Sequence, residues 1–190
     1  LRRRDSWIER EYKRYLKSGK NNTFDEFLDL DNDQGNWKKK DVYFFPKIKH
    51  LEHKFDHKPL VLFFNDLKKN TWNYIDKFAK YMNASYNKGD INTRIKHKSY
   101  NTKQLKIIQK FNQKFMPQGP NYSDIYFIRK IQRWLRMIPR YIVLYSAIFI
   151  PDNFVSDKPL IPPSKLQRVR EKYSEDWEKC KKYAKANNPL

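Results

Sequence analysis

The sequence is poor in glycine and cysteine: its 190 residues include only four glycines and one cysteine. So few glycines leave little room for a loop that wraps a phosphate, and no GxxxxGK[ST] motif is present. The single Cys180 excludes a disulfide framework and a zinc site built from several cysteines. The longest apolar run covers residues 141–150, and a membrane-spanning helix needs about 20 residues, so we expect no membrane crossing.

The most pronounced feature that is present is positive charge. Lysine and arginine number 41 against 21 acidic residues, which gives a formal net charge of +20 at pH 7. This charge predicts an anionic partner, which is a polymer, a membrane surface or a phosphorylated small molecule. Aromatic residues make up 16% of the chain, more than a disordered segment carries, so we expect a packed core. The length fits a single domain, at roughly 100–200 residues per domain.

Hydrophobic spacing and capping signals predict a largely helical chain. A capping box over Thr23–Glu26 marks the start of one short helix. The continuous apolar run after Pro59 predicts a buried strand of a parallel sheet at 59–64, between two helices, as in α/β proteins. The expected helices cover 5–18, 24–30, 42–55, 70–82, 102–115, 123–138 and 164 to about 186.

The basic and aromatic stretch over 122–150 has three interpretations. A break is expected near Pro139, after which the helical pattern resumes through the apolar run 141–150. A domain of this length must bury its most apolar segment somewhere, which favours a core helix. The arginines near Trp134 instead suit peripheral contact with a membrane surface, and a lid over an acceptor is the third alternative.

Three segments together resemble the nucleotide-dependent sulfotransferases, in the correct order and over most of the chain. In that family a strand ends in an Arg and enters a helix that carries a Ser eight residues later and a Tyr two beyond it. Arg2 matches the Arg, Tyr12 matches the Tyr, and Asn65-Asp66-Leu67 stands in the place of the family's Glu-Asp-Leu turn. The matching segments read LRRRDSWIEREY with the later TFDEFL, PLVLFFNDLKKNTWNYIDKFAKYMNAS, and LQRVREKYSEDWEKCKKY.

The resemblance implies a P-loop NTPase-like three-layer α/β fold, mostly helical in this segment and incomplete at its N-terminus. It implies transfer of a sulfuryl group from 3′-phosphoadenosine-5′-phosphosulfate to a hydroxyl or amine, without a metal. Arg2 then binds the 3′-phosphate of the donor, as a guanidinium at the end of a strand does through bidentate hydrogen bonds. The family's Ser, a second ligand of that phosphate, falls on Arg10, whose reach and geometry differ from those of a hydroxyl.

Other parts of the family's site are not found in these residues. The donor-binding loop with its Lys and Ser/Thr lies further N-terminal in the family, and the catalytic base is expected upstream or in an unmatched region. The chain therefore resembles the C-terminal two-thirds of an enzyme, as a fragment or as an inactive relative. We expect an anionic or carbohydrate acceptor. A cytoplasmic location follows unless an anchor precedes Leu1, as in the Golgi-anchored members of the family.

The remaining candidate residues have plainer interpretations. His50, His53 and His57 share a helical spacing, but solvated histidines explain them better than a metal site does. His97 lies in a basic loop with Arg94 and Ser99, where contact with donor or acceptor is conceivable. Two further functions stay open: a basic nucleic-acid-binding module, which suits the charge and aromatic content, and a non-catalytic interaction domain derived from a transferase fold.

Overall fold

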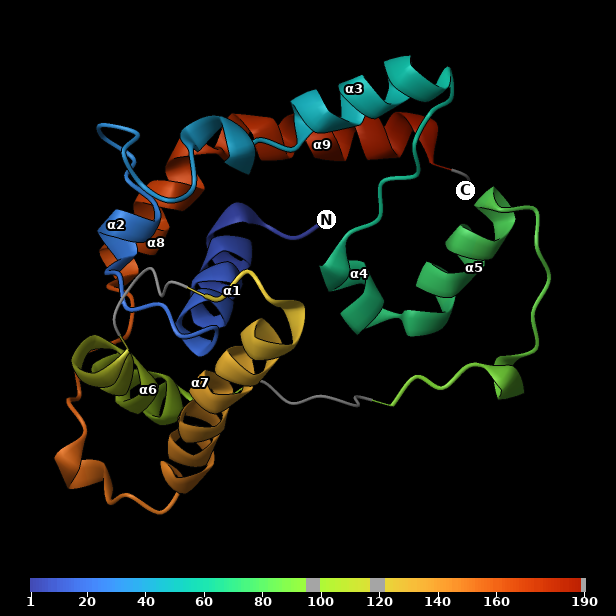
Figure 1. Ribbon diagram of the computed structural model, residues 1–190. Helices are drawn as coiled ribbons and strands as arrows, with labels where there is room; N and C mark the ends of the chain where they lie inside the picture. The colour runs from blue at the N-terminus through green and yellow to red at the C-terminus, as the bar shows by residue number, and fades with distance from the viewer. Residues whose placement is uncertain (95–99, 117–121, 189–190) are drawn as a thin grey trace. The chain divides into compact units, whose positions relative to one another are not determined.

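The computed structural model describes residues 1–94, 100–116 and 122–188, and these residues are helical wherever they form regular structure (Figure 1). Short 3₁₀ turns lie at Lys39–Val42, Lys88–Asp90 and Asp152–Phe154. The α-helices are α1 (Arg4–Lys17), α2 (Phe24–Phe27), α3 (Phe45–Phe55), α4 (Phe64–Lys69), α5 (Thr71–Tyr81), α6 (Thr102–Phe115), α7 (Tyr126–Ser146), α8 (Pro163–Lys172) and α9 (Ser174–Asn187).

The chain predicted as a single domain divides into two compact units. The first comprises Leu1–Trp7, Trp37–Lys98 and Leu166–Leu190, and the second comprises Ile8–Asn36 and Ser99–Lys165. The start of α1 therefore belongs to the first unit and the rest of that helix to the second.

In the first unit α3 packs along α9, which is clear in Figure 1, and α4 packs against α5. A core cluster joins Ile48 of α3 to Cys180, Tyr183 and Ala184 of α9, together with Val61 from the segment before α4. Helix α3 begins at Phe45 and not at Val42 as predicted, so Pro46 lies in its first turn, where the missing N–H costs nothing.

In the second unit α6 packs against α7 through Leu105, Ile108 and Leu144. The part of α1 in this unit buries Ile8, Tyr12 and Leu16, which are four residues apart and therefore share one helix face. The helix stops where Gly19 adopts a φ of +94°, a conformation that a residue with a Cβ rarely takes.

The predicted capping box is confirmed, whereas two other residues predicted as N-caps lie inside helices: Asp5 in the first turn of α1 and Ser164 in α8. Thr23 caps α2 with the reciprocal Glu26 contact of a capping box, although that helix ends at Phe27 and not at Leu30. Asn70 caps α5, its side chain accepting from the Asn73 N–H at 3.0 Å. These signals depend on residues three positions apart, so a local sequence pattern is enough to predict them.

The strand predicted at 59–64 is not formed, and none of the described residues forms a strand. Val61 is buried, as expected, and Phe63 has an extended backbone, but the chain enters α4 at Phe64. A strand requires a neighbouring strand to receive its backbone hydrogen bonds. Among the described residues, Leu1 is the one backbone partner of this segment from another part of the chain, through the contacts described below.

Several helix boundaries were predicted wrongly, among them the starts of α3 at Phe45 and of α7 at Tyr126, against predicted starts at 42 and 123. The helix expected from Ser164 to about 186 is divided into α8 and α9 at Tyr173, and α8 begins at Pro163. The helix expected to break near Pro139 continues through it to Ser146. Proline removes one backbone donor, and the rest of α7 continues its helix regardless.

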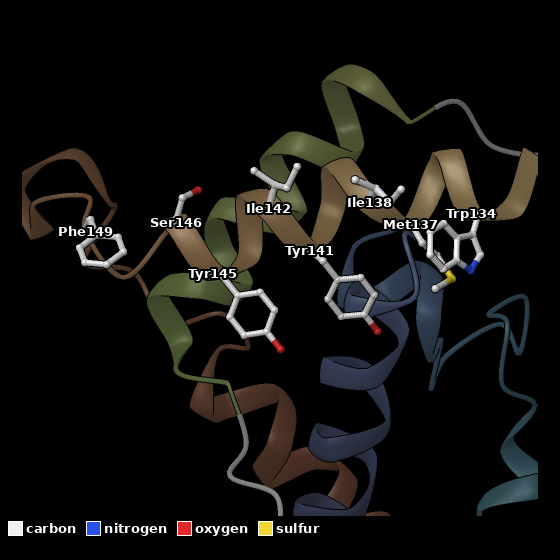
Figure 2. A pocket seen from close by; sticks show the side chains of 8 residues that line it. All are labelled: Trp134, Met137, Ile138, Tyr141, Ile142, Tyr145, Ser146 and Phe149. Carbon is white, nitrogen blue, oxygen red and sulfur yellow. The ribbon is translucent and has the colours of Figure 1, made fainter.

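The prediction that the apolar run 141–150 is core is also wrong for most of its residues. Leu144 and Ala147 are buried, whereas Ile142, Tyr145 and Phe149 are exposed. A hollow of about 620 Å³ opens on this outer side of α7 (Figure 2). The helix therefore directs much of its apolar surface away from the described core of its own unit.

Candidate functional site

The first residue of the described chain pairs with the extended segment before α4 in the manner of a parallel sheet. The amino nitrogen of Leu1 donates to the carbonyl of Leu62, and the N–H of Phe64 donates to the carbonyl of Leu1 at 2.7 Å. Bonds to the residues on either side of Phe63 are the pattern of a parallel ladder. Asn188, beyond α9, holds the same segment through both backbone groups of Val61, at 3.1 and 2.7 Å.

Both paired segments run directly into helices. The first passes through Arg2 and Arg3 into α1, and the second enters α4 at Phe64. Arg2 is half-buried, and its guanidinium carbon lies 3.7 Å from the centre of the Phe64 ring. An arginine and a helix N-terminus thus stand together where two parallel segments end, an arrangement that favours anions.

The charges around the first turn of α1 are mostly positive. Asp5 is the acidic residue of that turn, and it is bound by Arg3 at 2.8 Å and by Arg170 of α8 at 2.9 Å. Burial alone would raise the pKa of Asp5. The hydrogen bonds from Arg3, the Ser6 backbone and Arg170 outweigh burial and lower that pKa below its ordinary value. Asp5 is therefore a paired carboxylate that leaves a net positive charge at this helix start.

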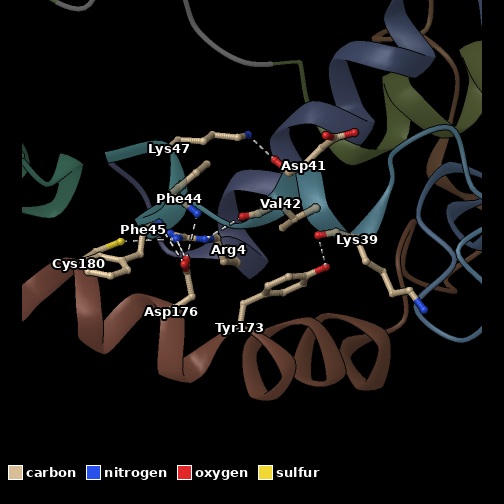
Figure 3. Close-up of polar contacts among 10 residues, drawn as sticks. All are labelled: Arg4, Lys39, Asp41, Val42, Phe44, Phe45, Lys47, Tyr173, Asp176 and Cys180. Atoms are coloured by element: carbon tan, nitrogen blue, oxygen red, sulfur yellow. Dashed lines mark hydrogen bonds and ion pairs between the residues drawn. The ribbon is translucent and has the colours of Figure 1, made fainter. Parts of the chain in front are cut away.

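Arg4, which the sequence interpretation passed over, is buried at the base of this site (Figure 3). Its guanidinium donates to Asp176 of α9 and, at 3.1 Å, to the carbonyl of Val42. Its carbon lies 3.6 Å from the centre of the Phe44 ring. Arg4 lies four residues before Ile8, in the same series as buried Tyr12 and Leu16. The helical spacing therefore already indicated that Arg4 is on the buried face.

Asp176 connects three elements of the first unit. Besides Arg4, its carboxylate accepts from the N–H of Phe44 at 3.0 Å and from the N–H of Phe45 at 2.9 Å. Those two N–H groups open α3, whose N-cap residue offers no side-chain acceptor of its own. Asp176 therefore caps α3 from a distant helix and fixes the start of α1 at the same time.

Parts of the three segments that suggested the resemblance to sulfotransferases are in contact within this unit, with only Leu1–Trp7 of the first segment included. Leu1 pairs with Phe63, and Arg4 binds Asp176, as described above. The Phe63 ring packs edge-on against Trp177 of α9, with centroids 5.0 Å apart. Residues far apart in the sequence thus surround one short parallel pair.

The second predicted phosphate ligand is not joined to the first by any described contact. Arg10 is exposed on α1 and belongs to the second unit, whereas Arg2 belongs to the first. Tyr12 of α1 is buried: its hydroxyl donates to the carbonyl of Asn22 at 2.9 Å and accepts from Gln109 at 3.1 Å. Burial raises the pKa of Tyr12 to about 12, so at neutral pH it is a structural hydroxyl.

The other candidates of the sequence form no reactive cluster among the described residues. His50 and His53 lie on α3, and His57 beyond it contacts the Tyr81 ring. Within 1–94, 100–116 and 122–188, no three His, Cys, Asp or Glu side chains gather as a metal ion requires. Burial raises the pKa of the Cys180 thiol, which disfavours the thiolate. His97 and Ser99 lie outside the described residues.

Comparisons with protein-family models, with curated proteins and with solved structures find no match to this chain. No helix in the described part of the chain has an apolar stretch long enough to cross a bilayer. We therefore infer the function from the chemistry and placement of the residues.

Proposed function

We propose that the chain has a sulfotransferase-like α/β fold and binds 3′-phosphoadenosine-5′-phosphosulfate, the donor of a sulfuryl group to a hydroxyl or amine. The observation that carries this proposal is the parallel pairing of Leu1 with Phe63, which leaves Arg2 at the carboxyl end of an extended segment, two residues before the start of α1. In open α/β folds, ligands bind at the carboxyl ends of the strands.

The proposed role of Arg2 is to hold the 3′-phosphate of the donor. A guanidinium presents a planar fork that binds two phosphate oxygens, and the first N–H groups of α1 add donors and a favourable dipole. Stacking on Phe64 restricts the motion of the Arg2 side chain, so less conformational entropy is lost when the phosphate binds. Arg10 is a weaker candidate for the same phosphate, because it lies on an exposed part of α1.

A thermal-shift titration with 3′-phosphoadenosine-5′-phosphate tests the proposal. At a hundred times its Kd a ligand stabilises by about 2.7 kcal/mol, which for a chain of this size raises the Tm by roughly 5–10 °C. Adenosine 5′-phosphate lacks the 3′-phosphate and is the matched ligand control. No shift with either nucleotide at millimolar concentration would refute donor binding by this chain.

Variants of the arginines locate the contact. Arg2→Ala removes a bidentate charged contact worth about 3 kcal/mol, so we expect roughly 100-fold weaker binding of the 3′-phosphorylated nucleotide. Arg2→Lys keeps the positive charge but lacks the planar fork, so its Kd for the 3′-phosphorylated nucleotide should lie between those of the native chain and Arg2→Ala. Arg10→Ala is the control on α1, and its Kd measures the separate contribution of that position. An unchanged Kd in Arg2→Ala would remove Arg2 from the site.

Nucleic-acid binding is the competing function, and ionic strength separates the two. Binding to a polyanion weakens steeply with salt, by three or more powers of ten between about 50 and 200 mM for six or more phosphate contacts. A single phosphate held by Arg2 and a helix N-terminus gives a far shallower dependence. Steep salt-dependent binding of RNA or DNA, without a nucleotide-induced shift, would favour the competing function.

A further inference from the structure

The long helix α7 is oriented in the opposite way to an ordinary amphipathic helix. Its buried Leu144 faces α6, and Arg140 on the neighbouring side donates to the carbonyl of Ser18. On a helical projection Arg129, Arg133, Arg136 and Arg140 cluster on one side, about 180° from the centre of the apolar stripe. Three of these arginines, all except Arg133, are partly covered by their own unit.

The opposite side of α7 carries an outer stripe of large apolar and aromatic side chains. Their relative exposures lie between 37% and 63%. A large side chain has roughly 150–250 Å² of surface, so the exposed area of the whole stripe is roughly 600 Å². This area equals the upper end of the range for the largest apolar patch on an ordinary monomer. The outer stripe consists of Trp134, Leu135, Ile138, Tyr141, Ile142 and Tyr145. Figure 2 shows all of these except Leu135. Tyr141 and Tyr145 form the edge of the stripe, where they contact Lys17 and Tyr100 of the same unit.

The charges near the outer stripe are of one sign. Between Asp124 and Asp152 the sequence has five basic residues and no acidic one. Lys130 and Arg133 are exposed, and their positions on the helix place Lys130 beside the stripe and Arg133 further round. With the net charge of +20, this composition is complementary to anionic headgroups and would repel a second copy of the chain.

We propose that α7 binds an anionic lipid surface by inserting its outer stripe into the headgroup region. Tryptophan and tyrosine favour that region, because each has an apolar body and a polar tip. The helix would lie in the plane of the interface with its apolar side about 5–10 Å deep, while Leu144 and the inward arginines keep it attached to its unit. This inference does not depend on donor binding at Arg2.

Co-sedimentation with lipid vesicles tests the proposal. We expect binding to vesicles of phosphatidylcholine mixed with phosphatidylserine, weaker binding to phosphatidylcholine alone, and weakening by salt. The double variant Leu135→Ser/Ile142→Ser should partition roughly 30- to 100-fold more weakly. The matched control Phe55→Ser/Phe78→Ser changes two exposed residues of the first unit and should bind as the native chain does.

Two further measurements distinguish insertion from other uses of the outer stripe. Trp134 should contribute a blue shift of fluorescence on anionic vesicles that Trp134→Phe removes while binding persists. Sedimentation velocity without lipid should give a monomer. A dimer that Leu135→Ser/Ile142→Ser dissociates would instead assign the stripe to a second copy and overturn the proposal. Equal vesicle binding by the stripe variant and the control would overturn it as well.

Discussion

The ion pair between Arg4 and Asp176 offers the sharpest test of how this chain is held together. Both side chains are buried, and they join the start of α1 to α9. Asp176→Asn keeps the size of the side chain but removes its charge, and it leaves the Arg4 guanidinium buried beside a neutral amide. Breaking a buried pair in this way costs about 3–5 kcal/mol, a large part of the roughly 5–15 kcal/mol that stabilises an ordinary domain.

The two partners should not be equally sensitive. If Arg4 is replaced by Met, Asp176 still accepts from the N–H groups of Phe44 and Phe45 at the positive end of α3. If Asp176 is replaced by Asn, Arg4 retains its full charge and has only neutral oxygen acceptors, the new amide and the Val42 carbonyl. Arg4 Nη1 is already buried without a hydrogen-bond partner among the described residues. We therefore expect Arg4→Met to cost about 1–3 kcal/mol, less than Asp176→Asn.

Equilibrium unfolding in urea, followed by tryptophan fluorescence, measures these costs, because Trp177 lies 5.5 Å from the Arg4 guanidinium. The double variant Arg4→Met/Asp176→Asn leaves no unpaired charge, so it should cost less than the sum of the single variants by about 1–3 kcal/mol. Leu51→Ala, at an exposed position of α3, is the control for the nearby fold. The reasoning would be refuted if the double variant lost as much unfolding free energy as the two single variants together. It would also be refuted if Arg4→Met lost more than Asp176→Asn.

Three more predictions concern packing and protonation. Leu144→Ala should cost about 2–5 kcal/mol of unfolding free energy in urea, whereas Leu135→Ala on the same helix should stay within about 0.5 kcal/mol; equal costs would contradict the inverted orientation of α7. Asn112→Ala should cost about 1–3 kcal/mol in the same assay, because buried Asn112 donates to two carbonyls at the end of α1, at 2.9 and 3.0 Å; exposed Gln113→Ala is its control. Folding lowers the pKa of Asp5 below its unfolded value of about 4. Its ionised carboxylate therefore contributes to folding stability above that unfolded pKa, and the contribution is lost as pH falls through the folded pKa. Asp5→Asn should therefore be less stable at pH 7 and show a flatter acid decline; an unchanged pH profile would contradict this.

Local signals in the sequence predicted some helix starts, such as those of α2 and α6, but they could not predict contacts between distant segments. The capping box at Thr23, the cap at Asn70 and the position of Pro46 all depend on neighbours within one helical turn. The burial of Arg4 depends on Asp176, which is 172 residues away, and no local pattern specifies that pairing. The absence of a strand at 59–64 has the same origin, because a ladder is a property of two segments.

The hydrophobic periodicity of α7 was insufficient to predict its orientation, for a different reason. Helical spacing reveals that one side of a helix is apolar and the opposite side is basic, but it does not say which side meets the protein. Of the three interpretations of this stretch, the one that makes it a core helix fails for Ile142, which the structure exposes, and holds for Leu144, which is buried. A surplus of arginine on an inward side is tolerated because the long stems pack while the guanidinium reaches backbone carbonyls, as Arg140 does at Ser18.

The run of three arginines at the start of the chain shows how one segment serves structure and proposed function together. The three side chains diverge: Arg2 stacks on Phe64, Arg3 pairs with Asp5, and Arg4 is buried against Asp176. Arg4 restricts how the start of α1 is rotated, because its guanidinium is bound to both Asp176 and the Val42 carbonyl. That rotation in turn sets the direction in which Arg2 leaves the backbone. The proposed phosphate site at Arg2 would therefore depend on the neighbouring buried pair, and Asp176, far away in the sequence, would be its positioning residue.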